Sequence, residues 1–191
     1  MVDEKKSEFL IGQLLVAMPD IGDPRFAKSV ILLCFHSEEG AMGVVLNKPA
    51  GQVKLSDILQ KSEKESVEEF DSITIHFGGP VEQYRAIFVH SSDCGEYSST
   101  KFVSDELGIT TTPDILEDFS RGKGPKSSKL LLGYAGWSPG QLENEIQQNS
   151  WLVCEGNPDI VFGTGSVELW NAAVKSLGIA PSMLSSVGGR A

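Results

Sequence analysis

The apolar residues of this chain are gathered in short runs, and no other feature constrains its fold as strongly. Runs rich in β-branched residues occupy positions 9–18, 29–35 and 42–46, and the turns between them contain Gly, Pro, Asp or Asn. Such runs are typical of buried strands, whereas helices repeat their apolar positions every three or four residues over a longer stretch. The first third of the chain therefore predicts strands joined by turns, and two prolines make the 19–26 loop rigid.

The rest of the chain adds further strands and a few helices. The strands are expected at 72–77, 84–90, 129–137, 150–154 and 159–162. Helices are expected to begin near Ser56, Pro113, Gln141 and Ser166, where capping residues or a proline precede an apolar stripe. Because strands and helices do not alternate regularly, the predicted class is α+β. The sheet is expected to be mixed and largely antiparallel, with a barrel-like form as one option, and about four helices flank it.

The chain shows no internal repeat and no Gly/Ser or Pro linker across its 191 residues. We therefore expect one domain at 9–191 after a flexible N-terminus at 1–8. The stretch 63–71 carries five acids against one lysine, which predicts a solvated acidic surface.

The apolar runs and the cysteines indicate the compartment. The longest purely apolar run, Val30 to Phe35, is far shorter than the roughly 20 residues that cross a bilayer. The three cysteines are an odd number and include no Cys-x-x-Cys pair. These features predict a cytoplasmic protein with reduced thiols and no membrane association.

The charge balance bears on the partners. With 16 Lys and Arg against 26 Asp and Glu, the formal net charge is −10, which argues against direct binding to nucleic acid. The loop 121–129 holds four bases and no acid, but it has no aromatic residue on which a base could stack. We interpret this loop as solvated.

One catalytic motif is present but incomplete. The segment 136–140 has the Gly-x-Ser-x-Gly form of a hydrolase nucleophile elbow, with Ser138 in the nucleophile position. The next residue, Pro139, has no N–H for an oxyanion, and all three histidines precede the serine. Ser138 is therefore expected to cap a helix, and no catalytic residue is assigned.

Cofactor and metal motifs are also incomplete. The turn at 163–166 is rich in glycine, but Glu168 stands where the dinucleotide fingerprint needs its third glycine. Cys34, His36, His90 and Cys94 are residues that zinc prefers, although their spacing is unspecific. We expect a helix-capping turn in the first case and, in the second, no metal; no cofactor is expected either.

The segment FLIGQLLVAMPDIGDPRFAKSVILLCFHSEEGAMGVVLNKP at 9–49 resembles the first signature of the bacterial AlgH/YqgE family. The segments GGPV at 78–81 and GYAGWSPGQLENEI at 133–146 are similar to its later signatures, in the same order. The resemblance implies a compact α+β cytoplasmic protein of a largely uncharacterised family, one member of which was named as a regulator of alginate synthesis. It implies no catalytic residues, and it is compatible with an indirect effect on transcription.

Several side chains beside the glycine-rich turns are candidates for one binding site. They are Asp23, Arg25, Asn47, Trp137, Gln141, Glu143 and Glu145. Gln141 and Glu145 share a helix face, whereas Glu143 points elsewhere. The structural alternative, which we favour, is that Arg25 pairs with one of these acids and ties its loop to the helix.

Two functional hypotheses remain open. The preferred one is a non-enzymatic binding or regulatory domain with a protein or small-molecule partner. The other is a hydrolase-like enzyme that uses a polar pocket near Asp23, Asn47 and Glu143, or Cys34 with a nearby histidine.

Overall fold

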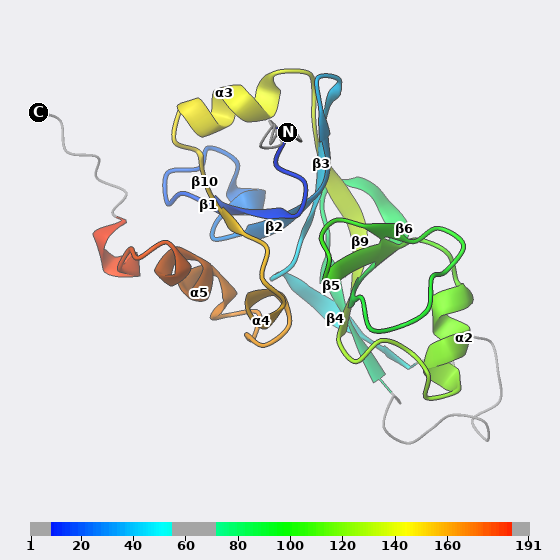
Figure 1. Cartoon of the computed structure of the whole chain (residues 1–191). Coiled ribbons are helices and arrows are strands. Elements are labelled where there is room, and N and C mark those ends of the chain that lie inside the picture. Colours follow the sequence, from blue (N-terminus) through cyan, green and yellow to red (C-terminus); the bar gives the residue numbers. More distant parts are fainter. Residues whose placement is uncertain (1–8, 55–71, 185–191) are drawn as a thin grey trace, which may run out of the picture.

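Ten strands form one curled sheet in the computed structural model, which describes residues 9–54 and 72–184 (Figure 1). The strands are β1 (Gln13–Ala17), β2 (Val30–Ser37), β3 (Gly40–Val45), β4 (Pro49–Lys54), β5 (Ser72–Phe77), β6 (Val81–Ser91), β7 (Lys101–Phe102), β8 (Leu107–Thr110), β9 (Ser128–Trp137) and β10 (Trp151–Glu155). The helices are α2 (Asp114–Ser120), α3 (Gln141–Gln147), α4 (Pro158–Val161) and α5 (Leu169–Ser176), with 3-10 turns η1 (Pro24–Phe26) and η4 (Pro181–Met183). The predictions for 1–8, for a helix near Ser56 and for the acidic stretch 63–71 lie outside the described residues.

The sheet is mixed and largely antiparallel, as predicted. Its main path runs β10-β1-β2-β3-β9-β6-β8-β7, and β4 joins through β5, which also pairs with β9. Only the β5–β9 pair is parallel among the described pairings. The long strand β9 connects the two halves of the sheet, because its last residues pair with β3 and its first residues pair with β5 and β6.

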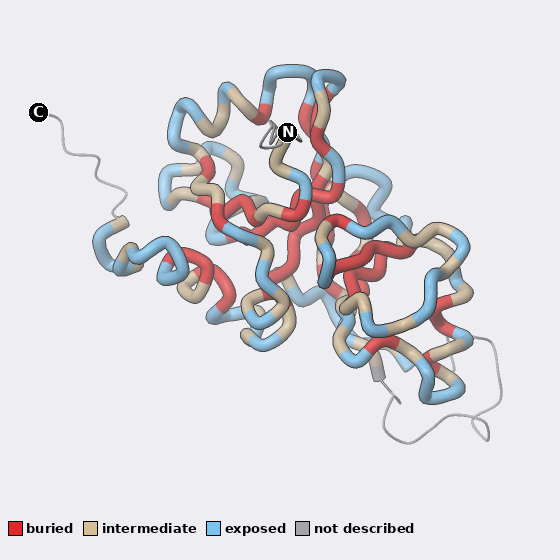
Figure 2. Tube along the Cα trace, in the orientation of Figure 1, coloured by how far each residue is buried: buried red, intermediate tan, exposed pale blue. Residues whose placement is uncertain are grey.

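Strict alternation along β1 divides its side chains between two apolar clusters. Leu14 and Val16 belong to a large cluster that contains the buried face of α5, whereas Leu15 and Ala17 belong to a second cluster with Leu142 of α3. Successive side chains of a strand point to opposite faces, so α5 and α3 cover opposite faces of this half of the sheet. After Gln13 the strand is apolar because both of its faces are buried, and Figure 2 shows the buried residues following the strands.

The other half of the sheet has its own helical cover. A third apolar cluster joins Ile115, Leu116 and Phe119 of α2 to Phe88 of β6 and Leu130 of β9. The neighbouring residues on these strands, such as Leu131, belong instead to the large cluster that spans both halves. The large cluster is therefore continuous along the sheet, while α3 and α2 each cover a separate patch on the opposite side.

The two halves meet where the Gly78-Gly79 pair crosses β9 at Gly133. The amide of Gly78 donates to the Leu132 carbonyl at 2.8 Å, and the Gly78 carbonyl accepts from the Val45 amide at 2.8 Å. A Cβ atom on Gly79 would lie 2.0 Å from the Tyr134 carbonyl carbon, and one on Gly133 would lie 2.5 Å from the Gly79 carbonyl oxygen. Gly133 also has φ +76°, which a side chain disfavours. Only glycine fits this crossing.

None of the helices among the described residues has the length and apolar character needed to cross a membrane.

The segment 159–162, predicted to be a strand, is instead the short helix α4. The Asn157 side chain accepts a hydrogen bond from the Asp159 amide at 2.7 Å, and Pro158 occupies the first turn. These are helix-start signals, and a four-residue apolar run cannot by itself distinguish a strand from a helix. The prediction is wrong because the cap outweighs the apolar run.

Ser138 does not cap α3 as expected. The residue at the N-cap is Gly140, with φ +73°, and no side chain caps the helix there. Gln141 nevertheless makes the return contact that is typical of a capping box, because its Oε1 accepts from the Ser138 amide at 3.0 Å. Ser138 itself is exposed at the surface.

Substitution of Gly133 tests whether the crossing limits stability. Gly133→Ala places a Cβ against backbone that cannot move aside, so we expect it to lower the free energy of unfolding by more than about 3 kcal/mol. Gly122→Ala is the matched control, because Gly122 has a similar φ of +65° but no atom within 4 Å of the position that a Cβ would take. It should cost only about 1–2 kcal/mol, the penalty of the left-handed backbone. Urea denaturation followed by circular dichroism measures both, and equal losses would contradict the proposed role of the close approach.

Candidate functional site

A cleft of about 360 Å³ lies between the 19–26 loop, the end of β9 and helix α3. This volume is within the range of small-ligand sites. Its lining includes five of the seven predicted site residues, which are Asp23, Arg25, Trp137, Gln141 and Glu145. Chain segments far apart in the sequence therefore bring most of the expected side chains together.

The loop side of the cleft carries an ion pair. Pro24 sits in the first turn of η1, and the Asp23 side chain caps that turn by accepting from the Arg25 amide at 2.9 Å. The same carboxylate receives the Arg25 guanidinium, with Nη2 2.6 Å from Oδ2. The hydrogen bonds from Arg25 lower the pKa of Asp23, so this carboxylate is ionised at neutral pH and is a weak base.

The ion pair does not tie the loop to α3, contrary to the structural alternative favoured from the sequence. Arg25 pairs with Asp23 two residues away, so both partners lie on the same loop. Both side chains are partly open to solvent, with 58% and 33% of their area exposed. An exposed ion pair of this kind contributes little to the free energy of folding. Its two side chains form the polar rim of the cleft.

Three aromatic rings form the floor of the cleft. Phe26 meets Trp151 edge to face with ring centroids 5.9 Å apart, and Trp151 meets Trp137 in the same way at 6.1 Å. Both tryptophans are buried in the cluster under α3. Edge-to-face rings are favourable beyond the area that they bury, so this row is rigid.

Glu145 of α3 holds the two tryptophans in place. Its Oε2 accepts from Nε1 of Trp137 at 2.9 Å and from Nε1 of Trp151 at 2.7 Å, while its Oε1 accepts from Nε2 of Gln141 at 2.9 Å. Gln141 and Glu145 lie one helical turn apart on the same face, as predicted from their spacing. The carboxylate is thus occupied by three protein donors and positions the aromatic floor.

Asn47 and Glu143 lie outside this cleft. Asn47 is buried, accepts from the Val30 amide at 2.9 Å and donates to the Lys28 carbonyl at 2.9 Å, so it fastens the base of the loop. Glu143 points to another side of α3, where its Oε1 lies 2.7 Å from Nε2 of His36. Among the described residues, Asn47 and Glu143 therefore do not join Asp23 in this cleft, contrary to the expectation of the enzyme hypothesis.

The structure also disfavours Cys34 as a nucleophile. Its thiol is buried in the large apolar cluster, and burial raises its pKa to about 12. A β-bulge between Leu33 and Phe35 interrupts the alternation of β2, so the nearby His36 turns to α3 instead of sharing a face with Cys34. Within 9–54 and 72–184, no three His, Cys, Asp or Glu side chains converge as metal ligands.

Several residues that line the cleft were not among the predicted site residues. Phe26 and Trp151 complete the aromatic floor, and Pro80 and Val81 form a wall. One signal in the sequence could have linked the tryptophans to Glu145. A buried indole N–H requires an acceptor, and Glu145 lies on the helix next to both tryptophans. No signal in the sequence places Pro80 and Val81 beside β9, since that neighbourhood depends on the glycine crossing.

Removal of Glu145 tests its role as the anchor of the floor. Glu145→Ala leaves two indole N–H groups without their acceptor, so we expect the free energy of unfolding to fall by about 2 kcal/mol or more. The Trp137 and Trp151 indole signals should shift in proton–nitrogen NMR spectra. The Trp170 indole, which donates to the Ala17 carbonyl at 2.8 Å, should not shift. Gln147→Ala, exposed on the same helix, is the control, and an equal effect from it would refute the assignment.

The fold and cleft define a class of α+β proteins in which a curled sheet is covered by separate helices and carries a loop-lined cleft at one end. The chain belongs to the AlgH-like family, whose model matches residues 14–182. This agrees with the resemblance seen in the three sequence segments.

Relatives and solved structures support the family and the fold. A UPF0301 protein of Paracoccus denitrificans is 46% identical over 188 residues, which cover 97% of this chain and 99% of the relative. The solution structure of the AlgH protein from Pseudomonas aeruginosa is 38% identical, with a TM-score of 0.76 over 100% of both chains. The crystal structure of a protein from Corynebacterium diphtheriae is 27% identical, with a TM-score of 0.67 over 86% of this chain and 85% of that one.

Proposed function

We propose that this chain is a non-catalytic binding domain that recognises a protein partner by taking up one of its apolar side chains in the cleft. The observation that carries the proposal is that the cleft combines an aromatic floor with polar groups that already have partners. Asp23 is held by Arg25, and Glu145 is held by two indoles and Gln141. General acid–base catalysis requires a group free to exchange a proton with the substrate, and these carboxylates are engaged elsewhere.

Exposed apolar residues in the first half of β6 favour a protein as the partner. Val81 lines the cleft and is 38% exposed, and Tyr84, three residues further along β6, is 98% exposed. Aromatic side chains that project fully into water are enriched at protein interfaces. The cleft then receives an anchor residue, while the Asp23–Arg25 pair at the rim contributes polar specificity.

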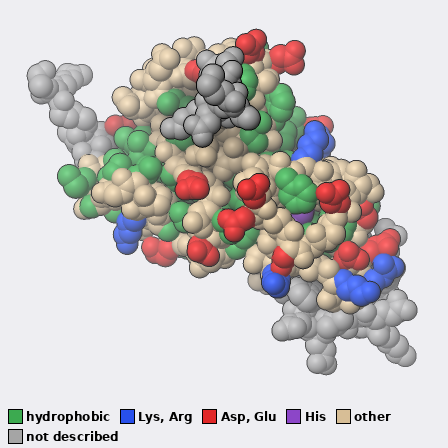
Figure 3. Space-filling view, viewed as in Figure 1, with side chains coloured by type: hydrophobic (Ala, Val, Ile, Leu, Met, Phe, Trp, Pro, Cys, Tyr) green, Lys and Arg blue, Asp and Glu red, His purple; other side chains and the backbone are tan. Residues whose placement is uncertain are grey.

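The charge of the chain indicates the chemistry of the partner. The formal net charge is −10, and Figure 3 shows Asp and Glu side chains spread over both halves of the face in view. Complementary charge speeds association and selects partners, so the partner is expected to carry a basic surface around its apolar anchor. An effect on transcription in the cytoplasm would be exerted indirectly through such a partner, without contact between this acidic chain and DNA.

A substitution that fills the cleft without disturbing the fold tests the proposal. Gly22 lines the cleft, and a Cβ atom there would meet no atom within 4 Å. Gly22→Val should therefore fold normally while its side chain narrows the space available to the anchor. Gly51→Val is the matched control, because Gly51 is also exposed with nothing within 4 Å of its Cβ position but lies on β4, outside the cleft lining.

The experiment has two stages. Proteins retained by the immobilised wild-type chain from an extract of its own bacterium are identified by mass spectrometry, and the affinity of the purified partner is then measured by calorimetry. We expect Gly22→Val to weaken binding by about tenfold or more and Gly51→Val to leave it unchanged. A partner that binds both variants equally, or no retained partner, would refute the proposal.

A further inference from the structure

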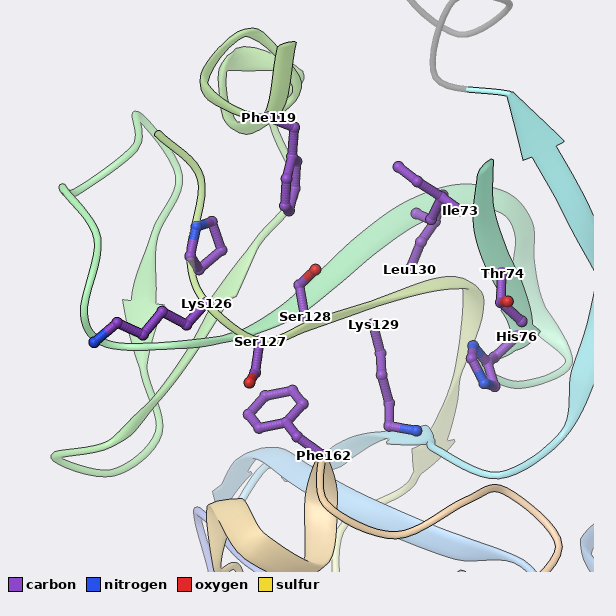
Figure 4. A pocket seen from close by; sticks show the side chains of 11 residues that line it. Ile73, Thr74, His76, Phe119, Lys126, Ser127, Ser128, Lys129, Leu130 and Phe162 are labelled. Atoms are coloured by element: carbon purple, nitrogen blue, oxygen red, sulfur yellow. The ribbon is translucent and has the colours of Figure 1, made fainter. Parts of the chain in front are cut away.

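A second cavity of about 370 Å³ lies between β5, the start of β9, helix α2 and the end of α4 (Figure 4). It shares no lining residue with the cleft described above. Its size is also in the range of small-ligand sites. The basic loop at 121–129, interpreted from the sequence as merely solvated, supplies one of its walls.

The ionisable side chains that line this cavity are all basic. They are Lys126, Lys129 and His76, and no Asp or Glu is among the lining residues. Lys129 is partly buried and forms no ion pair with any side chain that the structure describes. A lysine withdrawn from water without an acidic partner is costly, so its charge is available to an incoming anion.

His76 is the second unsatisfied group at this cavity. It is only 5% exposed; its Nε2 lies 3.2 Å from Oγ of Ser166, and its Nδ1 has no hydrogen-bond partner among the described residues. Buried polar atoms are almost always paired in native proteins. His76 therefore brings a buried, incompletely paired ring to the cavity wall beside Lys129, where a nearby anion would favour its protonated form.

The electrostatics of the two groups agree with this view. Burial lowers the pKa of Lys129, and burial together with the Lys129 charge lowers the pKa of His76. Burial thus disfavours positive charge on both groups. A bound negative charge offsets the repulsion and raises both pKa values.

The remaining lining is apolar or carries hydroxyl groups. Figure 4 shows Phe119 from α2 and Phe162 near α4 reaching toward the cavity from opposite directions, with Ser127 and Ser128 on the strand between them. Inorganic ions need no apolar walls. The two rings are therefore suited to the hydrocarbon part of a ligand, and the serines can donate further hydrogen bonds.

We propose that this cavity binds a small organic anion, with its carboxylate or phosphate group held by Lys129 beside His76 and its apolar body between Phe119 and Phe162. The site is separate from the partner-binding cleft, and it stands whether or not that function is correct.

The probes are phenyl phosphate, benzoate, inorganic phosphate and the neutral benzyl alcohol, each titrated into the full chain. Calorimetry gives the affinity, and proton–nitrogen NMR locates the perturbed residues. We expect phenyl phosphate or benzoate to bind with shifts at His76 and Lys129, and benzyl alcohol to bind at least about tenfold more weakly. The preference between phenyl phosphate and benzoate then distinguishes a phosphate from a carboxylate ligand.

Two lysine variants provide a matched comparison. Lys129→Gln removes the unpaired charge and should weaken binding of the preferred probe by about tenfold or more. Lys126→Gln is the control, because the Lys126 side chain is 88% exposed and its Nζ lies 3.5 Å from Asp93. Lys129→Gln should also be at least as thermally stable as the wild type, since it relieves a desolvated charge.

A third variant tests the apolar half of the site. Phe162→Ala should weaken phenyl phosphate or benzoate but leave the binding of inorganic phosphate unchanged. The proposal would be overturned if neither organic anion bound at millimolar concentrations, if benzyl alcohol bound equally well, or if Lys126→Gln weakened binding as much as Lys129→Gln.

Discussion

The contact on which the rest of this structure depends is the crossing of Gly78-Gly79 over β9 at Gly133, where backbone touches backbone. Before Gly133, Leu130 packs under α2 and Leu131 faces the large cluster. After it, Tyr134 packs on the large cluster, while Ala135 and Trp137 face α3. Strict alternation would have kept Leu131, Ala135 and Trp137 on one face. The left-handed backbone at Gly133 reverses the alternation, so one strand serves both halves of the sheet.

The cleft is a consequence of this geometry. Trp137 reaches the cleft because it lies beyond the reversal, and Pro80 and Val81 reach it because they follow the crossing pair directly. Asn47 fastens the loop that carries Asp23 and Arg25, so it acts on the cleft from a distance. The site is therefore preorganised by the glycine crossing, by the buried Asn47 amide and by Glu145, which bridges the two indoles. Preorganisation of this kind lowers the entropic cost of binding.

Local signals predicted most elements of the fold. The alternating run at 72–77 predicted strand β5, and Pro113 predicted the start of helix α2. Both signals act within a few residues of the chain, so they can be recognised without tertiary context. Residues 159–162, expected as a strand, form a helix that Asn157 and Pro158 start, and β4, β7 and β8 were not predicted. Strand β4 (Pro49–Lys54) is largely exposed and has little apolar patterning, so its pairing with β5 is set by tertiary context.

The candidate site was predictable only in part, for a related reason. Spacing on α3 correctly placed Gln141 and Glu145 together and Glu143 apart. Arg25 was expected to pair across to the helix but finds Asp23 on its own loop, because η1 brings the two side chains together locally. The second cavity could not be foreseen at all, since His76 and Lys129 meet through the parallel pairing of β5 with β9.

The most direct test of this account is native-state hydrogen exchange at the crossing. The Gly78 amide donates to the Leu132 carbonyl at 2.8 Å, and the Val45 amide donates to the Gly78 carbonyl at 2.8 Å. If the crossing organises both halves, these amides should exchange only when the whole protein unfolds, with an opening free energy equal to that from urea denaturation. Exchange through local opening at a much lower free energy would show that the two halves move independently there, and would contradict the account.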